Sequence, residues 1–172
     1  MSAILGIDLG ERRIGIAIAD GPGVGARPLT TIPRGRDIAS DVVALERLAA
    51  EHGVDELVVG LPIDAAGHEG EQAQRTRAWV AALSAGLEAS EAAHAPRISL
   101  QDERLTSHVA EGRLGPMPRG RSGGPPTRQQ RDAYRARVDR EAAAIILQDS
   151  LDSRAQGSPG SAPTGATMEP RP

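Results

Sequence analysis

The chain has 172 residues, of which 39% are hydrophobic, and this is enough for one domain with a core of ordinary size. It contains no cysteine, which excludes a disulfide framework, a thiolate zinc site and a cysteine nucleophile, and fits a cytoplasmic location. All 20 basic residues are arginine, so a lysine Schiff base and a Walker-loop lysine are excluded. No apolar run approaches the roughly 20 residues that span a bilayer, so we expect no membrane partner.

Charge is distributed unevenly along the chain. The net charge is −3, yet residues 113–140 hold eight arginines and only two acidic residues. A basic block on an otherwise acidic protein is typical of contact with a polyanion, although it could also keep a loop soluble. We therefore expect nucleic acid as a partner of this block.

The first part of the chain predicts three strands. Two runs rich in β-branched residues, 3–9 and 13–19, are separated by three residues that include Gly10, and this spacing is typical of a tight hairpin. Residues 27–33 supply a third strand, with prolines near its ends, where a missing N–H is tolerated. We therefore expect the sheet to begin with three antiparallel strands.

Helices and strands then alternate. The expected elements are a helix over 38–52 ended by Gly53, a strand over 55–61, a helix over about 72–93, a strand over 97–101, a short helix from near Thr106, and a last helix from the capping box at 127–130 to about Asp152. This order predicts an α/β fold in which helices flank a mixed five-stranded sheet. Residues 1–152 are expected to form one domain, and the Ser-, Pro- and Gly-rich residues 153–172 a disordered tail.

Three carboxylates occur where the pattern is otherwise apolar or small. Asp8 interrupts the first strand, and Glu103 ends the fifth. Asp139 lies on the last helix, on the same face as Ala142, Ala143 and Ile146, and this face is expected to pack on the sheet. Ionised carboxylates held close together repel one another, so a site with three of them implies a bound cation. Mg²⁺ prefers such oxygen ligands, and two ions can clamp the oxygens of a phosphodiester during displacement.

Each acid also has a structural interpretation. Asp8 could be a tolerated strand-end residue, Glu103 a solvated strand end, and Asp139 the partner of Arg135 or Arg140 along its own helix. The basic pair at 12–13 is equally compatible with a solvated turn and with a surface that faces a phosphate. Only the joint placement of the acids favours a metal site.

Four stretches together resemble the YqgF (RuvX) family of RNase H-like proteins: "LGIDLGERRIGIAIAD", "ELVVGLPIDAAGHEGEQA", "DERLTS" and "VDREAAAIILQDSLD". The resemblance covers residues 3–152 and implies an RNase H-like fold with a nuclease site that uses Mg²⁺ or Mn²⁺. By position, it implies that Asp8, Glu103 and Asp139 are the catalytic and metal-binding residues. Glu11 departs from the family pattern, which often has Thr or Ser there. We assign nucleic-acid contacts to Arg12, Arg13, Arg104, Thr106, Arg135 and Arg137.

The resemblance implies hydrolysis of phosphodiester bonds in the 5′-end processing of pre-16S rRNA during ribosome biogenesis, by a monomer or homodimer. The alternative is a Holliday junction resolvase that acts on four-way DNA. Two other hypotheses are a noncatalytic RNA-binding module and an actin-like ATP-binding lobe, since "GIDLG" also opens that superfamily. Actin-like proteins need two lobes around the nucleotide, and a chain of 172 residues supplies one.

Overall fold

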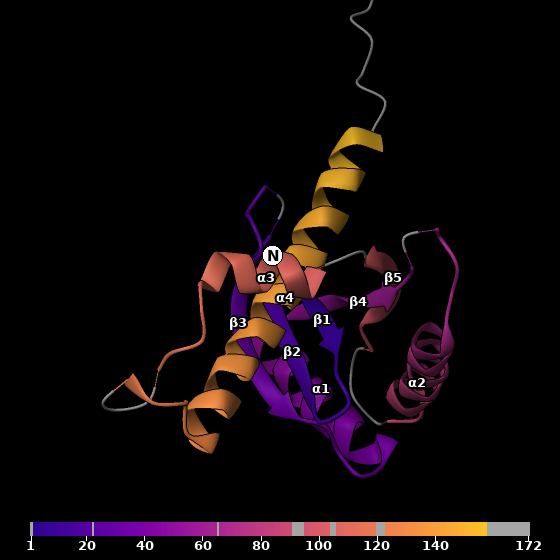
Figure 1. Cartoon of the computed structure of the whole chain (residues 1–172). Helices are drawn as coiled ribbons and strands as arrows, with labels where there is room; N and C mark the ends of the chain where they lie inside the picture. The colour runs from indigo at the N-terminus through magenta and orange to yellow at the C-terminus, as the bar shows by residue number, and fades with distance from the viewer. Residues whose placement is uncertain are drawn as a thin grey trace, which may run out of the picture.

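The computed structural model describes residues 2–21, 23–64, 66–90, 95–103, 106–119 and 123–157 (Figure 1). Its elements in chain order are β1 (Ala3–Leu9), β2 (Arg13–Ala19), β3 (Arg27–Pro33), α1 (Ile38–His52), β4 (Val54–Pro62), α2 (Glu71–Ala89), β5 (Arg97–Glu103), α3 (Thr106–Leu114) and α4 (Arg128–Gly157). In the described ranges, no helix is both long enough and apolar enough to cross a membrane.

The five strands form one mixed sheet in the order β3-β2-β1-β4-β5. β1, β2 and β3 pair antiparallel, whereas β4 and β5 run parallel to β1. The predicted hairpin and the predicted mixed five-stranded sheet are therefore confirmed. In the β1–β2 register, Asp8 lies opposite Gly15.

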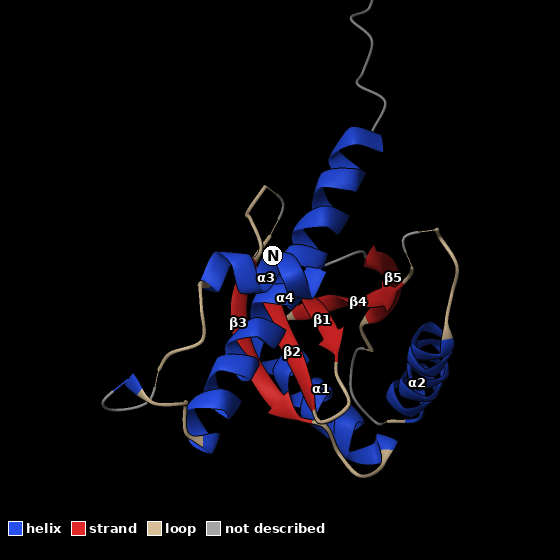
Figure 2. Ribbon diagram, in the orientation of Figure 1, coloured by secondary structure: helices blue, strands red, loops and turns tan. Residues whose placement is uncertain are grey.

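Helices cover both faces of the sheet (Figure 2). Because side chains alternate along a strand, Leu5 and Ile7 of β1 point into a core shared with α1 and α2. Ile4 and Gly6 point to the opposite face, which α4 covers. Asp8 follows the same alternation, so this acid faces α4 and not the larger core.

α4 lies unusually close to the sheet because glycines face it. A Cβ at Gly6 would lie 2.6 Å from the carbonyl oxygen of Ala143, so the helix backbone contacts the β1 backbone directly. Ala143 and Ile146 are buried at this interface, as the sequence predicts, whereas Ala142 packs in a separate cluster with Ala110 of α3 and Tyr134. The close approach places Asp139, one turn earlier, near the carboxyl end of β1.

The helix ends follow local signals. Gly53 ends α1 in the left-handed conformation, with φ 61°. The capping box forms as predicted, since Gln130 N–H donates to Thr127 Oγ1 at 3.2 Å and Thr127 N–H donates to Gln130 Oε1 at 2.8 Å. α2 ends at Ala89, earlier than expected, because the backbone at Ser90 is extended.

The last strand ends where predicted, whereas the last helix is longer than expected. β5 ends at Glu103 because it pairs with β4 along its whole length, as far as Pro62. α4 continues past Asp152 to Gly157, so residues 153–157 are helical and do not belong to a disordered tail. The rest of the predicted tail, residues 158–172, lies outside the described residues. Near its end, Arg154 donates to the buried Glu56 of β4 at 3.0 and 2.5 Å, which ties the last turns of the helix to the sheet.

Candidate active site

Two acidic residues lie at the same edge of the sheet. β1, β4 and β5 are parallel, so their carboxyl ends meet, and Asp8 and Glu103 lie near the carboxyl ends of β1 and β5. β4 lies between β1 and β5, and its Gly60 has no side chain to block the Glu103 carboxylate. A Cβ at Gly60 would lie only 2.6 Å from Glu103 Oε2. The Glu103 side chain therefore passes over Gly60, on the strand next to β1.

The third acid comes from α4. Gly15, opposite Asp8 in the sheet, has no side chain, and a Cβ at this position would overlap the carbonyl oxygen of Asp139. The backbone of Asp139 is thus held against β2, beside Asp8. The fold brings the three predicted acids to one end of the interface between the sheet and α4.

The acids influence one another electrostatically. The pKa of Asp8 is raised from 3.8 to about 8, first because the carboxyl is buried, then because Glu103 and Asp139 carry negative charges nearby. Burial also raises the pKa of Glu103. A positive charge close to Asp8 would therefore favour its ionised form and lower its pKa again.

Asp139 already has a cationic partner. Arg13 Nε donates to Asp139 Oδ2 at 2.7 Å, and both side chains are about one quarter exposed, at 26% and 24%. The sequence alternative, a pair with Arg135 or Arg140 on the same helix, is not the contact that the structure contains. Across the described residues, neither Asp8 nor Glu103 has a salt-bridge partner.

The carboxylates of Asp8, Glu103 and Asp139 are the candidate ligands for a divalent cation. Carboxylate oxygens are the ligands that Mg²⁺ and Mn²⁺ prefer. In the described part of the chain, however, no three Asp, Glu or His side chains are placed closely enough to hold a metal ion. The carboxylate of Asp139 accepts a hydrogen bond from Arg13. The three acids fit a hard cation in chemistry and charge, with the third ligand engaged elsewhere.

A hollow of about 520 Å³, lined by three arginines and three acidic residues, includes Asp139. It lies between the β1–β2 turn and the first half of α4, and its lining residues are Gly10, Glu11, Arg12, Arg13, Asp132, Arg135 and Asp139. Three of the residues assigned to nucleic acid, Arg12, Arg13 and Arg135, therefore share one surface. Their guanidinium groups match the charge and geometry of backbone phosphates.

The other assigned contacts are not part of this surface as described. Arg137 is exposed on α4 but does not line the hollow, because two residues along a helix turn its side chain away from that of Arg135. Thr106 is the first residue of α3, and the structure does not describe its side chain. Arg104 lies outside the described residues.

Sequence reasoning missed three contributors to the site. Gly15 and Gly60 allow the close approach of Asp139 and Glu103, but a glycine in a strand run predicts only a weak point or a bulge. Asp132 lines the hollow one turn before Arg135, and this helical spacing could have indicated it.

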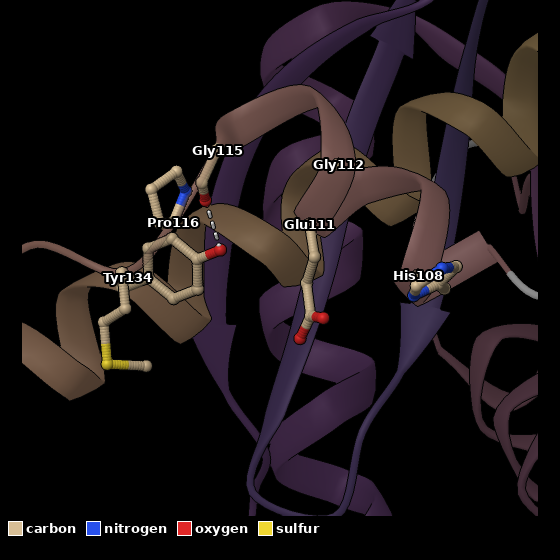
Figure 3. Close-up of a pocket in the computed structure, with 7 residues that line it drawn as sticks. His108, Glu111, Gly112, Gly115, Pro116 and Tyr134 are labelled. Carbon is tan, nitrogen blue, oxygen red and sulfur yellow. Dashed lines mark hydrogen bonds between the residues drawn. The ribbon is translucent and has the colours of Figure 1, made fainter.

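A second hollow, of about 530 Å³, lies between α3, the segment that follows it and α4. In Figure 3, the Tyr134 hydroxyl points at the carbonyl oxygen of Gly115, to which it donates at 2.7 Å. His108 and Glu111 also line the hollow, and none of the three clustered acids does. This contact fixes the start of the loop after α3 to α4.

The sequence model of the family described as "RuvX: Holliday junction resolvase" matches residues 2–153. The chain belongs to the RuvX family. Family membership and the mixed five-stranded sheet together confirm the RNase H-like fold class.

Curated relatives of this RuvX chain are named as candidate pre-16S rRNA nucleases. The Synechococcus sp. protein is 42% identical over 152 residues, which cover 88% of this chain and 90% of the relative. The Chloroflexus aggregans protein is 41% identical over 151 residues, with 88% and 94% covered. The Anaeromyxobacter dehalogenans protein is 42% identical over 151 residues, with 88% and 97% covered.

Solved structures similar to this RuvX chain include Thermus thermophilus RuvC in complex with a Holliday junction substrate. That match has a TM-score of 0.46 and 12% identity, and it covers 90% of this chain and 96% of the other. The yeast mitochondrial Holliday junction resolvase matches with a TM-score of 0.39 and 12% identity, covering 90% and 86%.

Proposed function

We propose that this chain is a metal-dependent endonuclease that hydrolyses phosphodiester bonds in the 5′-end processing of pre-16S rRNA. The observation that carries the proposal is the cluster of Asp8, Glu103 and Asp139 at a hollow that Asp139 shares with three arginines. The cluster offers anionic oxygens to a cation, and the hollow offers cations to a polyanion. The names of the relatives support pre-16S rRNA as the substrate.

The carboxylates of Asp8, Glu103 and Asp139 would hold Mg²⁺ or Mn²⁺. When bound, a divalent cation supplies the Lewis acidity that phosphodiester hydrolysis needs. Arg12 and Arg135 hold backbone phosphates at the hollow and so align the strand beside the acids. The buried position of Asp8 limits access of bulk water and strengthens every charge interaction at the site.

The second candidate is cleavage of four-way DNA, which the description of the matching family favours. Phosphate contacts are largely independent of sequence, so the same arginines suit RNA and DNA. We place the enzyme in the cytoplasm, as a monomer or homodimer.

The test is a cleavage panel of precursor 16S rRNA and four-way junction DNA, with Mg²⁺, Mn²⁺ or EDTA. Removing one metal ligand should cost several kcal/mol of transition-state stabilisation, so Asp8→Asn should lower the cleavage rate by about 100-fold or more. Asp20→Asn makes the same chemical change beyond the opposite end of β2, at an exposed residue, and should cleave like the wild type.

The substrate that is cut, and the position of the cut, decide between RNA and DNA. Equal cleavage by wild type and Asp8→Asn would refute the assigned acids. Binding of RNA without cleavage under any metal condition would favour a noncatalytic RNA-binding module. Tight ATP binding without affinity for nucleic acid would favour the actin-like lobe.

A further inference from the structure

The ion pair between Arg13 and Asp139 connects the arginines of the hollow to the acidic cluster. Arg13 belongs to β2 and lines the hollow, and its Nε donates to Asp139 Oδ2 at 2.7 Å. Asp139 is the only one of the three clustered acids with a salt bridge in the described residues. A guanidinium group therefore already supplies to Asp139 the positive charge that Asp8 and Glu103 lack.

We infer that Arg13 takes the place of a divalent cation on Asp139 in the metal-free protein, and that metal entry requires Asp139 to exchange Arg13 for the metal. The inference rests on the proposed metal-dependent function. Arg13 acts through Asp139, so it is a positioning residue and not a catalytic one.

The surroundings of the pair favour such an exchange. The backbone of Asp139 is fixed, because its carbonyl oxygen contacts β2 at Gly15, so only the side chain has to rotate. Both members of the pair are about one quarter exposed, which lets water solvate each of them during the exchange. In the present arrangement, no three acids of the described residues are placed to hold a metal ion.

The test is the affinity for Mn²⁺ alone, measured by the loss of the free Mn²⁺ signal in electron paramagnetic resonance, without nucleic acid. Releasing Asp139 from one part-buried ion pair should make Arg13→Gln bind Mn²⁺ about fivefold more tightly than the wild type. Arg12→Gln removes the same charge from the same hollow but no ion pair of the described residues, so it should change the affinity by less than about twofold. Arg13→Lys keeps a cation for Asp139 and should bind like the wild type.

The same two substitutions made in an Asp139→Asn protein test whether the effect of Arg13 acts through the Asp139 carboxylate. With Asp139→Asn, the carboxylate is absent, so adding Arg13→Gln should no longer differ from adding Arg12→Gln. A folding defect would weaken Mn²⁺ binding, which is the opposite of the expected gain. Arg13→Gln that binds no more tightly than Arg12→Gln would overturn the inference.

Mn²⁺ binding by Asp8→Asn distinguishes failure of the proposed metal site from failure of the inference on Arg13. Asp8→Asn should weaken Mn²⁺ binding if the acids form the metal site. If Mn²⁺ binds to the wild type and Asp8→Asn equally well, or to neither, then both the site and this inference fail. If binding depends on Asp8 but not on Arg13, only the inference fails.

Discussion

Asp8 lies in a strand between the buried residues Ile7 and Leu9, and its carboxyl has a pKa near 8 in the folded chain. Burial is the first cause of this shift, and the charges of two neighbouring acids are the second. A residue that has to ionise in such surroundings lowers the stability of the fold. The same surroundings suit a cation, so the cost in stability and the proposed function come from one arrangement.

The effect on stability depends on pH. The folded-state pKa of Asp8 is raised, so its stabilising contribution is fully present below pH 3.8 and is lost as the pH rises through about 8. In EDTA, Asp8→Asn should therefore melt roughly 5 °C above the wild type at pH 9, and the difference should shrink toward pH 4. The measurement is a series of thermal melts followed by circular dichroism.

Asp20→Asn is the control for this series, because Asp20 is an exposed acid paired with Arg27, away from the cluster. Saturating Mg²⁺ should close the gap at pH 9, since the metal stabilises the ionised wild type. If the melting temperature of Asp8→Asn at pH 9 is equal to or below that of the wild type, then ionisation of Asp8 does not destabilise the fold.

At the scale of elements, the site depends on how closely α4 packs on the sheet. Gly6 and Gly15 lack the side chains that would hold the helix away, and Ala143 has only a small one on the helix side. Near the end of the helix, Arg154 binds Glu56 and Ser99, so the contacts of α4 with the sheet extend from Asp139 to Arg154. The backbones of β1 and β2 therefore set the position of α4, and with it that of Asp139.

Gly15→Ala should disturb this packing directly. The added Cβ would overlap the carbonyl oxygen of Asp139, so α4 must shift, and we expect a loss of about 1–3 kcal/mol in the free energy of unfolding. The cleavage rate should fall as well, because Asp139 moves with the helix. Urea unfolding and the cleavage assay measure the two effects.

Gly112→Ala provides the matched control. Gly112 lies in α3, and a Cβ there would have no described atom within 4 Å. Replacing a helical glycine by alanine should raise stability by up to about 1 kcal/mol. If Gly15→Ala is as stable as Gly112→Ala, the close approach of α4 to β2 is not needed.

At the scale of the whole molecule, a chain with net charge −3 presents arginines to one hollow. The distribution of charge, and not its total, allows contact with a polyanion. Arg12 and Arg13 come from the β1–β2 hairpin, whereas Arg135 comes from α4, so the hollow exists only in the folded chain.

Nucleic-acid binding should depend strongly on salt. Each phosphate contact releases a counterion, so Arg135→Gln should lower the slope of log affinity against log salt concentration by about 1. The measurement is fluorescence anisotropy with a precursor 16S rRNA fragment in EDTA, over a range of KCl concentrations. Arg47→Gln, on α1 at the opposite face of the sheet, should leave the slope unchanged. An unchanged slope for Arg135→Gln would remove the hollow from the interface.

The sequence by itself determined the strands, most helix boundaries, and the positions of the three acids along the chain. These features depend on short-range signals: alternation along a strand, the capping box at 127–130, and Gly53 after α1. Such signals act over a few residues, so one sequence is enough to detect them. The end of α4 differed from the prediction because the contact of Arg154 with Glu56 is made across the fold.

Only the tertiary structure decided how the acids are partnered. Asp139 binds Arg13, 126 residues earlier, and not an arginine of its own helix, because the packing of α4 on β2 brings the two side chains together. The grouping of Arg12 with Arg135 follows from the same packing. Spacing along the chain contains no information on which turn of a helix will face which strand, and the partners of Asp139 depend on that geometry.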